Sequence, residues 1–481
     1  MQSASPDDAL APDWLKEPAD PNDLAPGVWP ASARRDSDGE LELGGVGVAD
    51  LRARFGTPLY VLDEAEVRAH AARIRSAFTA AAAAHGTKAR IYYAGKAFLS
   101  TEVVRWVTEE GLRVDVCSRG ELEIALAAGV KPSRIGFHGN NKTVAELERA
   151  VEVGVGTIIL DSAIEIERLG AIAERLGAVQ RVLLRVNSGV HAETHDFLAT
   201  AHEDQKFGTA LEAAPALVER IREIRSLKLR GLHCHIGSQI FGSAGFAESA
   251  SRLVELHAEL RAGGELPLLN LGGGFGIAYT SADDPTPIEE LASAIVDAVA
   301  RECEVRGIPV PTLAFEPGRA VVGQAGVTLY EVGTTKQVSL GDRGERLYVS
   351  VDGGMSDNAR PALYGSQYSA RIASRLGDTD PVLVRVVGSH CESGDVVVDH
   401  EYLPSDVTPG DLLAVPATGA YCHALSSNYN HTPRPAVVAV RDGLARVIVR
   451  GDTLADLLAR DAGIAAAQTE RAGVRAGEGE E

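Results

Sequence analysis

The chain has 481 residues, 45% of them hydrophobic, and a formal net charge of −20 at pH 7. Its length allows two or three domains, and its strongly negative charge argues against binding to nucleic acid or to an anionic membrane surface. We find no apolar run in the sequence that is long enough to cross a bilayer.

The two ends of the chain differ in composition from the rest. Residues 1–27 are acidic and rich in proline and lack the basic start and apolar core of a signal peptide, so we expect a mobile extension there. Residues 28–58 are expected to add one or two strands to a later β domain. Residues 465–481 are rich in Ala, Gly and Glu, which predicts a disordered tail. The five cysteines are scattered and odd in number, which is typical of free thiols in a reducing cytoplasm.

From residue 59 to residue 326, short apolar runs alternate with helix-length amphipathic segments. A first run, Leu59–Leu62, precedes a predicted helix at Ala65–Phe78. Eight further runs follow: Arg90–Ala94, Leu112–Val116, Arg134–Phe137, Thr157–Leu160, Arg181–Val186, Leu229–His235, Leu268–Leu271 and Thr312–Phe315. Strands that alternate with helices pair in parallel, and eight such units predict a (β/α)8 barrel of the TIM type. An open, doubly wound sheet is the alternative, but the polar residues at one end of nearly every strand favour the barrel.

After about Gly326 the pattern changes to β-forming runs separated by turns, over residues 327–464. The predicted strands are Leu347–Val351, Val382–Val387, Asp395–His400, Asp411–Val415, Ala436–Val440 and Leu444–Val449. Only Gln367–Arg375 has the pattern of a helix. The region therefore predicts a C-terminal antiparallel β domain, either a sandwich or a small barrel.

Ionisable residues and glycines follow the predicted barrel strands at their carboxyl ends, where barrels of this kind place their active sites. These residues are Lys96, Asp115, His138, Asn140, Asp161, Arg185, His235, Gly272–Gly274 and Glu316. Chance would distribute such residues over both ends of the strands. The clustering therefore predicts an enzyme.

Two of these features favour a phosphorylated aldehyde cofactor. Lys96 follows a strand that should be buried, and an amine in that position can form an imine with the aldehyde of pyridoxal phosphate (PLP). Gly272–Gly274 follow the seventh strand, where successive glycines allow backbone N–H groups to converge on a phosphate. The run does not follow a first strand in the G-x-G-x-x-G pattern of dinucleotide-binding folds. Taken alone, such a run is more often a tight turn without a ligand, but here it accompanies Lys96 and Glu316.

Glu316 and Arg319 follow the eighth strand. A carboxylate there can pair with the pyridine nitrogen of PLP and keep the ring protonated, which makes the ring a strong electron sink. Arg319 can bind a phosphate or a substrate carboxylate through two hydrogen bonds. The alternative is a simple surface ion pair between the two side chains.

His233 and His235 lie on one face of the sixth predicted strand. Two histidines so placed could bind a metal, but no third ligand has a convincing spacing, so we predict no metal site. A better interpretation places His235 over the cofactor ring and Ser238 against the phosphate. His233 is then a core residue.

Two motifs in the predicted β domain have both a structural and a functional interpretation. Cys391-Glu392-Ser393 could be a strand-to-turn transition, or a substrate loop with a thiol proton donor and a carboxylate for an ammonium group. Arg360 and Tyr364 could belong to a solvated turn, or they could reach a substrate carboxylate. Spacing alone does not decide between these interpretations.

As a set, these motifs closely resemble those of the alanine-racemase-like (fold type III) PLP-dependent decarboxylases, and within that family the diaminopimelate decarboxylases of actinobacterial type. The resemblance extends from about Pro26 to Asp461. The motifs that carry it are Tyr93-Ala94-Gly95-Lys96, Asp115–Glu121, His235–Gln239, Gly272–Gly274, Glu316–Arg319, Cys391–Asp395 and Gly419–Tyr421. The sequence departs from the family pattern at Arg119, where glycine is common, and in its longer acidic N-terminus.

The resemblance implies a role for each matching position. Lys96 would bind PLP covalently, His235 would stack on its ring and Glu316 would pair with its nitrogen. Cys391 and Lys96 are both candidate proton donors. Further cofactor contacts would come from Asp115, Arg185, Ser238, Gly273, Gly274, Gly318, Arg319 and Tyr421. Substrate contacts would come from Arg319, Arg360, Tyr364, Glu392, Ser393 and Tyr421. The Cys391–Ser393 segment would reach the site of a partner subunit, which implies a homodimer with shared active sites.

The reaction that the resemblance implies converts meso-2,6-diaminopimelate to L-lysine and carbon dioxide, the last step of lysine biosynthesis. One rival is decarboxylation of another basic amino acid or of a carboxylated polyamine. A second is a non-catalytic PLP-binding homologue, and a third is amino-acid racemisation. The resemblance disfavours racemisation, because racemases of this fold have an arginine where this chain has Glu316.

Overall fold

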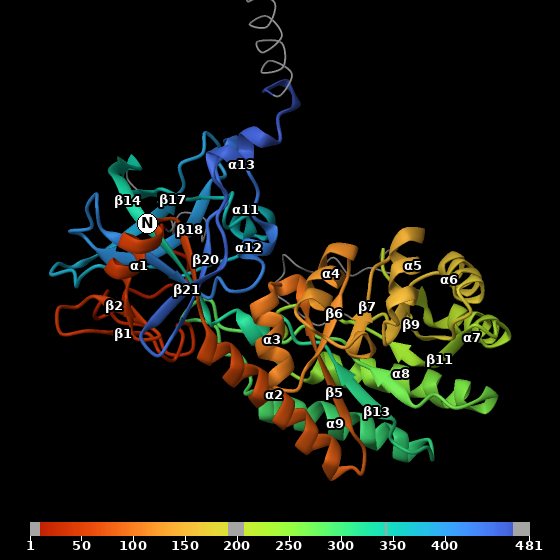
Figure 1. Ribbon diagram of the computed structural model, residues 1–481. Helices are drawn as coiled ribbons and strands as arrows, with labels where there is room; N and C mark the ends of the chain where they lie inside the picture. The colour runs from red at the N-terminus through yellow and green to blue at the C-terminus, as the bar shows by residue number, and fades with distance from the viewer. Residues whose placement is uncertain (1–9, 191–205, 342–343, 465–481) are drawn as a thin grey trace, which may run out of the picture.

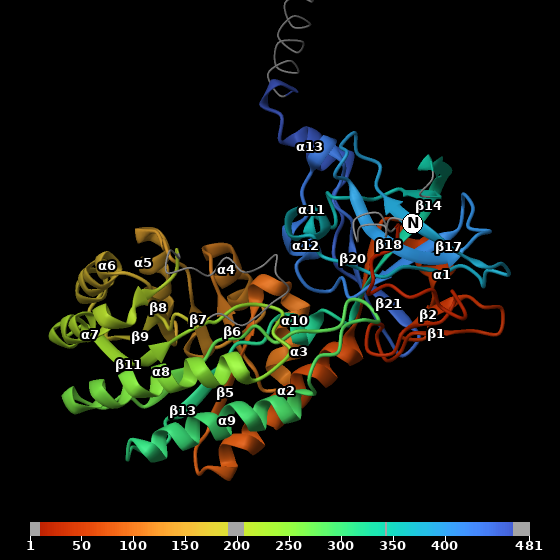
Figure 2. The same cartoon turned by 180° about the vertical axis from the view of Figure 1, so that it is seen from behind.

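The computed structural model describes residues 10–190, 206–341 and 344–464. These residues form two units that lie side by side, a parallel barrel and a β domain (Figures 1 and 2). No helix within the described ranges is long and apolar enough to span a membrane. The predictions for residues 1–9 and for the tail at 465–481 concern residues outside this description.

Eight parallel strands form the barrel. They are β5 (Ala89–Ala94), β6 (Arg113–Val116), β7 (Ile135–Phe137), β8 (Thr157–Leu160), β9 (Gln180–Asn187), β11 (Leu227–His233), β12 (Leu268–Asn270) and β13 (Thr312–Phe315). The order β9-β11-β12-β13-β5-β6-β7-β8 closes on itself because β8 also pairs with β9, and the two-residue β10 (Thr209–Ala210) extends β9. The (β/α)8 prediction is confirmed, with every predicted strand within two residues of its observed bounds.

Helices cover the outside of the barrel (Figure 1). They are α2 (Glu64–Ala84), α3 (Thr101–Glu109), α4 (Arg119–Ala127), α5 (Val144–Val153), α6 (Ala163–Arg175), α7 (Ala214–Glu223), α8 (Ala244–Leu260), α9 (Ile288–Val305) and the short α10 (Arg319–Val322). Ser100, Ser118, Thr143 and Ser162 cap α3 to α6, each side chain accepting a hydrogen bond from the backbone N–H three residues on. Such a cap stabilises a helix by about 1 kcal/mol and fixes where each strand-to-helix loop ends.

A small apolar layer fills the inside of the barrel. Tyr92, Ile159, Leu183, Leu268 and Ala314 form it, and each is buried. Residues two positions apart on a strand point the same way. The residues that follow this layer along their strands therefore point into the carboxyl-terminal mouth of the barrel, above an apolar floor.

The β domain is built on a nine-stranded mixed arrangement. Its strands are β4 (Leu59–Asp63), β14 (Gly326–Ser339), β15 (Glu345–Val351), β16 (Arg371–Ile372), β17 (Pro381–Val387), β18 (Val396–Pro404), β19 (Leu412–Pro416), β20 (Val437–Arg441) and β21 (Leu444–Val449). The main path runs β18-β17-β15-β14-β4-β20-β21, and β19 joins β14 to β16. Most pairings are antiparallel, as predicted, but β15–β17 and β4–β20 are parallel.

Strand β4 belongs to the β domain and not to the barrel, where the sequence pattern predicts it. The run at Leu59–Leu62 was grouped with the barrel, but it pairs with β14 and β20 of the β domain. All five residues of β4 are buried. A strand buried on both faces reads as a continuous apolar run, so its sequence looks the same in a barrel and in a sheet centre.

The helix predicted at Gln367–Arg375 is wrong. This segment is extended and contains β16, and residues 368–373 are all buried, whereas an amphipathic surface helix would expose one face. The helices of the β domain are short and lie elsewhere, at α11 (Arg360–Tyr364), α12 (Cys422–Leu425) and α13 (Leu454–Ala459).

The N-terminal region is tied to the β domain. Strands β1 (Arg34–Arg35), β2 (Leu41–Leu43) and β3 (Val46–Gly47) form a small sheet of their own, followed by α1 (Val48–Phe55), and they pack on the β domain through a shared apolar cluster. Residues 10–27, expected to be mobile, contact the same domain: Arg346 donates to the Leu10 carbonyl oxygen at 2.8 Å and Arg371 to that of Asp23 at 2.8 Å.

Candidate active site

Polar side chains stand directly above the apolar floor of the barrel. Asp161, Arg185, Asn270 and Glu316 each lie two residues after a member of the apolar layer. Since side chains alternate along a strand, all four point into the barrel mouth. Because the carboxyl ends of all barrel strands meet at one mouth, these four residues lie in one site although they are far apart in the sequence.

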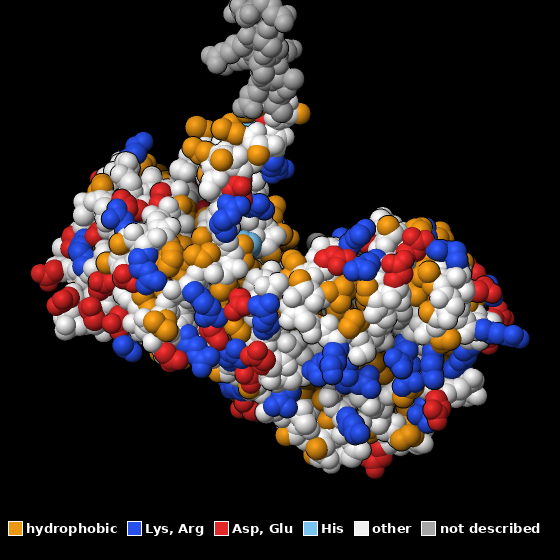
Figure 3. Space-filling view, viewed as in Figure 1, with side chains coloured by type: hydrophobic (Ala, Val, Ile, Leu, Met, Phe, Trp, Pro, Cys, Tyr) orange, Lys and Arg blue, Asp and Glu red, His pale blue; other side chains and the backbone are white. Residues whose placement is uncertain are grey.

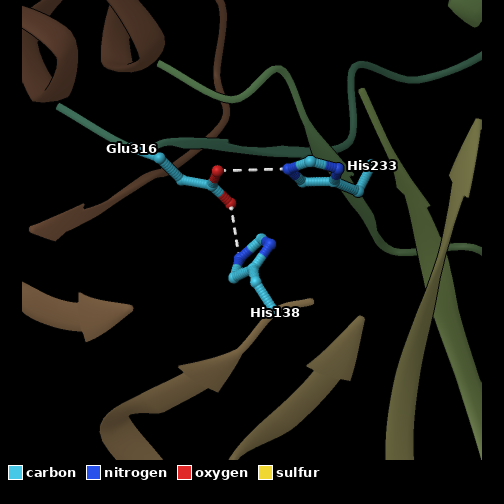
Figure 4. Close-up of side chains that lie close together, drawn as sticks. All are labelled: His138, His233 and Glu316. Carbon is cyan, nitrogen blue, oxygen red and sulfur yellow. Dashed lines mark hydrogen bonds and ion pairs between the residues drawn. The ribbon is translucent and has the colours of Figure 1, made fainter. Parts of the chain in front are cut away.

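Glu316, directly after β13, is the centre of the cluster (Figure 4). Its Oε1 accepts a hydrogen bond from Asn270 Nδ2 at 2.6 Å and lies 3.2 Å from His138 Nε2, and its Oε2 lies 3.1 Å from His233 Nε2. Burial alone would raise the pKa of the Glu316 carboxyl, but His138 and His233 outweigh burial and hold that pKa well below its ordinary value. Glu316 is therefore a buried carboxylate with its charge intact.

The two histidines beside Glu316 differ in charge. Burial lowers the pKa of His233 to about 4, so His233 is neutral at pH 7. Burial also opposes the charged form of His138, but Glu316 and Asp115 prevail and raise its pKa to about 9. His138 is therefore an imidazolium that lies between two carboxylates, 3.5 Å from Asp115 Oδ1 and 3.2 Å from Glu316 Oε1.

Asp115 lies at the end of β6 within this cluster. Burial and the nearby charge of Glu316 raise the pKa of the Asp115 carboxyl to about 7. Its Oδ2 is buried and has no hydrogen-bond partner among the described residues. Gly136 on the neighbouring β7 leaves room for this carboxylate, because a Cβ there would overlap Asp115 Oδ1.

Lys96 sits in a short 3-10 turn at Gly95–Ala97, immediately after β5, with its side chain exposed. Its charge acts on Asp115 and on His235, which places the amine near both. The turn is fixed from the β domain, since Tyr421 N–H donates to the Ala97 carbonyl oxygen at 2.7 Å. A free amine is thus held at the edge of the carboxylate cluster.

His235 and the glycine run make the next wall of the site. Burial, with Lys96 nearby, holds the pKa of His235 well below its ordinary value, and its Nδ1 accepts a hydrogen bond from Gly273 N–H at 3.3 Å. His235 is therefore neutral with its proton on Nε2. A Cβ on Gly273 would overlap the Glu316 carbonyl oxygen, and one on Gly274, at φ +110°, would overlap that of Gly237. Only glycine allows these loops to approach so closely.

Arg319 begins α10 behind the glycine run. Its Nη2 donates to Ser238 Oγ at 2.8 Å, and its Nη1 donates to the Tyr279 hydroxyl. The guanidinium also lies 4.8 Å from the ring centre of Tyr421. A Cβ on the preceding Gly318 would lie only 3.1 Å from Ala94 Cβ, so this loop packs closely on the end of β5.

Arg360 comes from the β domain and meets the same aromatic rings. Its guanidinium carbon lies 5.4 Å from the ring centre of Tyr421, 5.6 Å from that of Tyr279 and 5.8 Å from that of Tyr364. Arg360 is buried, Tyr364 is exposed, and the Nε of Arg360 has no hydrogen-bond partner within the described residues. Arg319 and Arg360, from different units, therefore lie against the same two tyrosine rings, Tyr279 and Tyr421.

Arg185 completes the far side of the mouth. Its Nε lies 4.0 Å from Asp161 Oδ1, and burial lowers the pKa of its guanidinium. The guanidinium lies 4.4 Å from the ring centre of Phe207. The side chain is thus held inside the site by a carboxylate and an aromatic ring.

The structure does not bring Cys391, Glu392 and Ser393 to this mouth. All three are exposed on the turn between β17 and β18. The hydrogen bonds of the turn, within the described residues, stay in the β domain; for example, Asp395 accepts from the N–H groups of Met355 and His390 at 2.6 and 2.7 Å. A role in catalysis for these residues therefore requires another subunit.

Three site residues were missed or undervalued from the sequence. Asn270 is the last residue of β12 and could have been found by the carboxyl-end rule. His233 was assigned to the core, but it contacts Glu316 directly. Tyr279 lies in a loop after the glycine run and carries no motif that would single it out.

The residues of the site fit PLP. Gly273 and Gly274, which we call the glycine cradle, lie in a closely packed loop near Ser238 and Arg319. A charged carboxylate, Glu316, lies above the apolar floor of the barrel. Lys96 supplies an amine at the edge. These are the groups that a phosphate, a pyridine nitrogen and an aldehyde need.

Comparisons with known proteins agree with this geometry. Residues 66–323 match the family model described as pyridoxal-dependent decarboxylase, pyridoxal binding domain. The diaminopimelate decarboxylase of Mycobacterium tuberculosis strain H37Rv is 50% identical over 443 residues, which cover 90% of this chain and 98% of the relative. The chain belongs to the diaminopimelate decarboxylase family.

More distant members of the family agree. The Bacillus subtilis diaminopimelate decarboxylase is 44% identical over 89% of this chain and 97% of its own length. A crystal structure described as diaminopimelate decarboxylase from m. jannaschii in co-complex with L-lysine is 31% identical, with a TM-score of 0.83 over 90% of this chain and 98% of that one. This protein is a PLP-dependent decarboxylase.

Proposed function

We propose that this diaminopimelate decarboxylase family member converts meso-2,6-diaminopimelate to L-lysine and carbon dioxide. The observation that carries the proposal is the meeting of Lys96, His235, Glu316 and the glycine cradle at one barrel mouth, beside two arginines. The relatives are named for decarboxylation of diaminopimelate, and the m. jannaschii structure is described with L-lysine bound.

Each wall of the site has a task in binding the cofactor. PLP supplies an electron sink for the electron pair that remains when carbon dioxide departs. Lys96 would bind the aldehyde carbon, neutral His235 would cover one ring face and the Glu316 carboxylate would pair with the ring nitrogen. Asp115 and Arg185 line the pocket. The phosphate is held by Ser238, Gly273, Gly274, Gly318, Arg319 and Tyr421.

The two arginines select the substrate. Arg319 and Arg360 bind the distal carboxylate of diaminopimelate, with Tyr364 and Tyr421 at its edge. The buried Arg360 Nε without a partner supports this role, because a substrate carboxylate would satisfy it. A basic amino acid without a distal carboxylate leaves that donor unpaired, which disfavours ornithine or lysine as substrates.

A second subunit completes the site. Cys391 protonates the product carbon, and Glu392 with Ser393 binds the distal ammonium, all from the partner chain of a homodimer. Their exposure in the single chain supports this arrangement. Figure 3 shows a notch between α12, which follows Tyr421, and α4, which follows the Asp115 loop, and a partner loop could enter there. All five cysteines are free, which supports the proposal of a reducing, cytoplasmic location.

The test uses purified full-length protein with PLP and meso-diaminopimelate, and measures lysine and carbon dioxide. We expect lysine formation from diaminopimelate and little or no product from L-ornithine or L-lysine. Mixing two inactive variants, Lys96→Ala and Cys391→Ala, should restore about a quarter of the activity, because half of the mixed dimers would be hybrids with one intact site. Absence of lysine would refute the reaction, and absence of restoration would refute the shared site.

A further inference from the structure

The carboxylate cluster of the barrel mouth carries more negative charge than one cofactor nitrogen needs. Asp115 and Glu316 both approach the same imidazole nitrogen, His138 Nε2, at 3.5 and 3.2 Å. Asp115 is buried, and only 9% of the Glu316 side chain is exposed. Buried carboxylates need cationic or hydrogen-bonding partners close by, and both of these converge on one ring nitrogen of His138.

The same cluster has the composition of a metal site. His138, His233 and Glu316 each offer one ligand atom, and the three atoms lie within 4.8 Å of one another (Figure 4). Two histidines and a glutamate are a ligand set that holds zinc in sites with an open fourth position. The sequence showed no third ligand by spacing, because Glu316 follows a different strand, 83 residues after His233.

The separations between ligand atoms suit a small ion. At zinc–ligand distances of about 2.0–2.1 Å, tetrahedral ligand atoms lie about 3.4 Å apart. Glu316 Oε1 lies 3.2 Å from His138 Nε2 and Glu316 Oε2 lies 3.1 Å from His233 Nε2, so each carboxylate oxygen is already near this spacing from one of the two histidines. The largest separation, up to 4.8 Å, has to shorten, which small side-chain rotations can accomplish.

The surroundings support the site independently. Asp115 Oδ2 is buried beside the cluster without a hydrogen-bond partner in the described part of the chain, so it can serve as a fourth ligand or hold a bound water. Asn270 Nδ2 fixes the Glu316 carboxylate at 2.6 Å, as outer partners of metal ligands commonly do.

We propose that the PLP-free protein binds one divalent transition-metal ion, zinc in the first instance, through His138, His233 and Glu316, and that this ion and PLP exclude one another. The exclusion rests on the proposed function, which assigns the Glu316 carboxylate to the ring nitrogen. In the metal-bound form the ring nitrogens of His138 and His233 that face Glu316 bind the ion and carry no proton.

The first experiment titrates PLP-free, full-length protein with ZnCl2 by calorimetry and with CoCl2 by visible absorption. We expect one ion per chain and the absorption of four-coordinate cobalt. His138→Gln and His233→Gln should each weaken zinc binding at least about tenfold. The control is His85→Gln, which removes a surface histidine that also lies beside a carboxylate, 2.6 Å from Asp297. Zinc affinity unchanged in both cluster variants, or reduced equally in the control, would overturn the proposal.

The second experiment measures PLP binding in the presence of zinc. We expect zinc to raise the apparent Kd of PLP in proportion to its concentration, and EDTA to restore PLP binding. Simultaneous binding of both would contradict the exclusion. A protein that forms lysine with PLP but binds no zinc refutes this inference alone, whereas one that binds zinc but forms no lysine refutes the proposed function alone.

Discussion

Replacement of Glu316 by glutamine is the substitution that best isolates the electrostatics of the site. The change keeps the shape of the side chain and removes its charge. The new amide can be accommodated: its oxygen accepts from Asn270 and His138, and its NH2 group faces His233 Nε2. His233 Nδ1 is buried without a partner among the described residues, so the ring proton can move to Nδ1 and Nε2 can accept. The proton on Nδ1 then has no acceptor among the described residues, so we expect a loss of about 1–3 kcal/mol in folding stability.

The effect of Glu316→Gln on catalysis should be large. The carboxylate is a fixed charge in a buried site, aimed where positive charge on the ring must be stabilised. Loss of one such preorganised group costs about 2.7–4 kcal/mol of transition-state stabilisation, or roughly 10²–10³ in kcat. The assay is lysine formation at saturating diaminopimelate, with PLP occupancy followed by absorbance and stability by thermal unfolding. A variant with bound PLP and a kcat within threefold of the parent would refute the role of Glu316.

Three further substitutions test other parts of the structure. Gly273→Ala introduces a Cβ that overlaps the Glu316 carbonyl oxygen, so we expect a loss of about 1–3 kcal/mol in stability and weaker PLP binding, by thermal unfolding and PLP titration. Arg360→Met should lower kcat/KM for diaminopimelate by an amount that corresponds to about 2–5 kcal/mol of transition-state stabilisation, and the affinity for PLP should not change. A kcat/KM equal to that of the parent protein would contradict the binding of the distal carboxylate by Arg360. His257 is buried with neither ring nitrogen hydrogen-bonded in the described residues, and burial lowers its pKa to about 4. Because the folded state then binds fewer protons, stability is lost as pH falls from about 6.5 to 4, and His257→Leu should remove up to about 3 kcal/mol of that loss in unfolding experiments across this range.

The barrel could be predicted because its strands are short apolar runs that alternate with helices, four of which, α3 to α6, begin at a capping serine or threonine. Parallel strands in such a barrel bring their carboxyl ends together, so Lys96, Asp115, His235 and Glu316 could be assigned to one site before any contact was known. Local sequence thus determined both the fold class and the side of the barrel that carries the chemistry.

The parts that failed depend on contacts between distant segments. The sequence of β4 does not predict its pairing with β14 and β20, because a strand that is buried on both faces is a continuous apolar run in either unit. The segment Gln367–Arg375 is extended because tertiary burial on all sides overrides its helical pattern. Likewise the contacts of His138 and His233 with Glu316 join strands that are remote in sequence, and no spacing rule could have found them.

Chemical trapping of the cofactor is the most direct test of the site as a whole. Reduction of the PLP-loaded protein with borohydride, followed by peptide mass spectrometry, should find the pyridoxyl phosphate group on the peptide that contains Lys96. The label should be absent in Lys96→Ala. A label on another lysine of the parent protein, or none, would contradict the assignment of the barrel mouth as the PLP site.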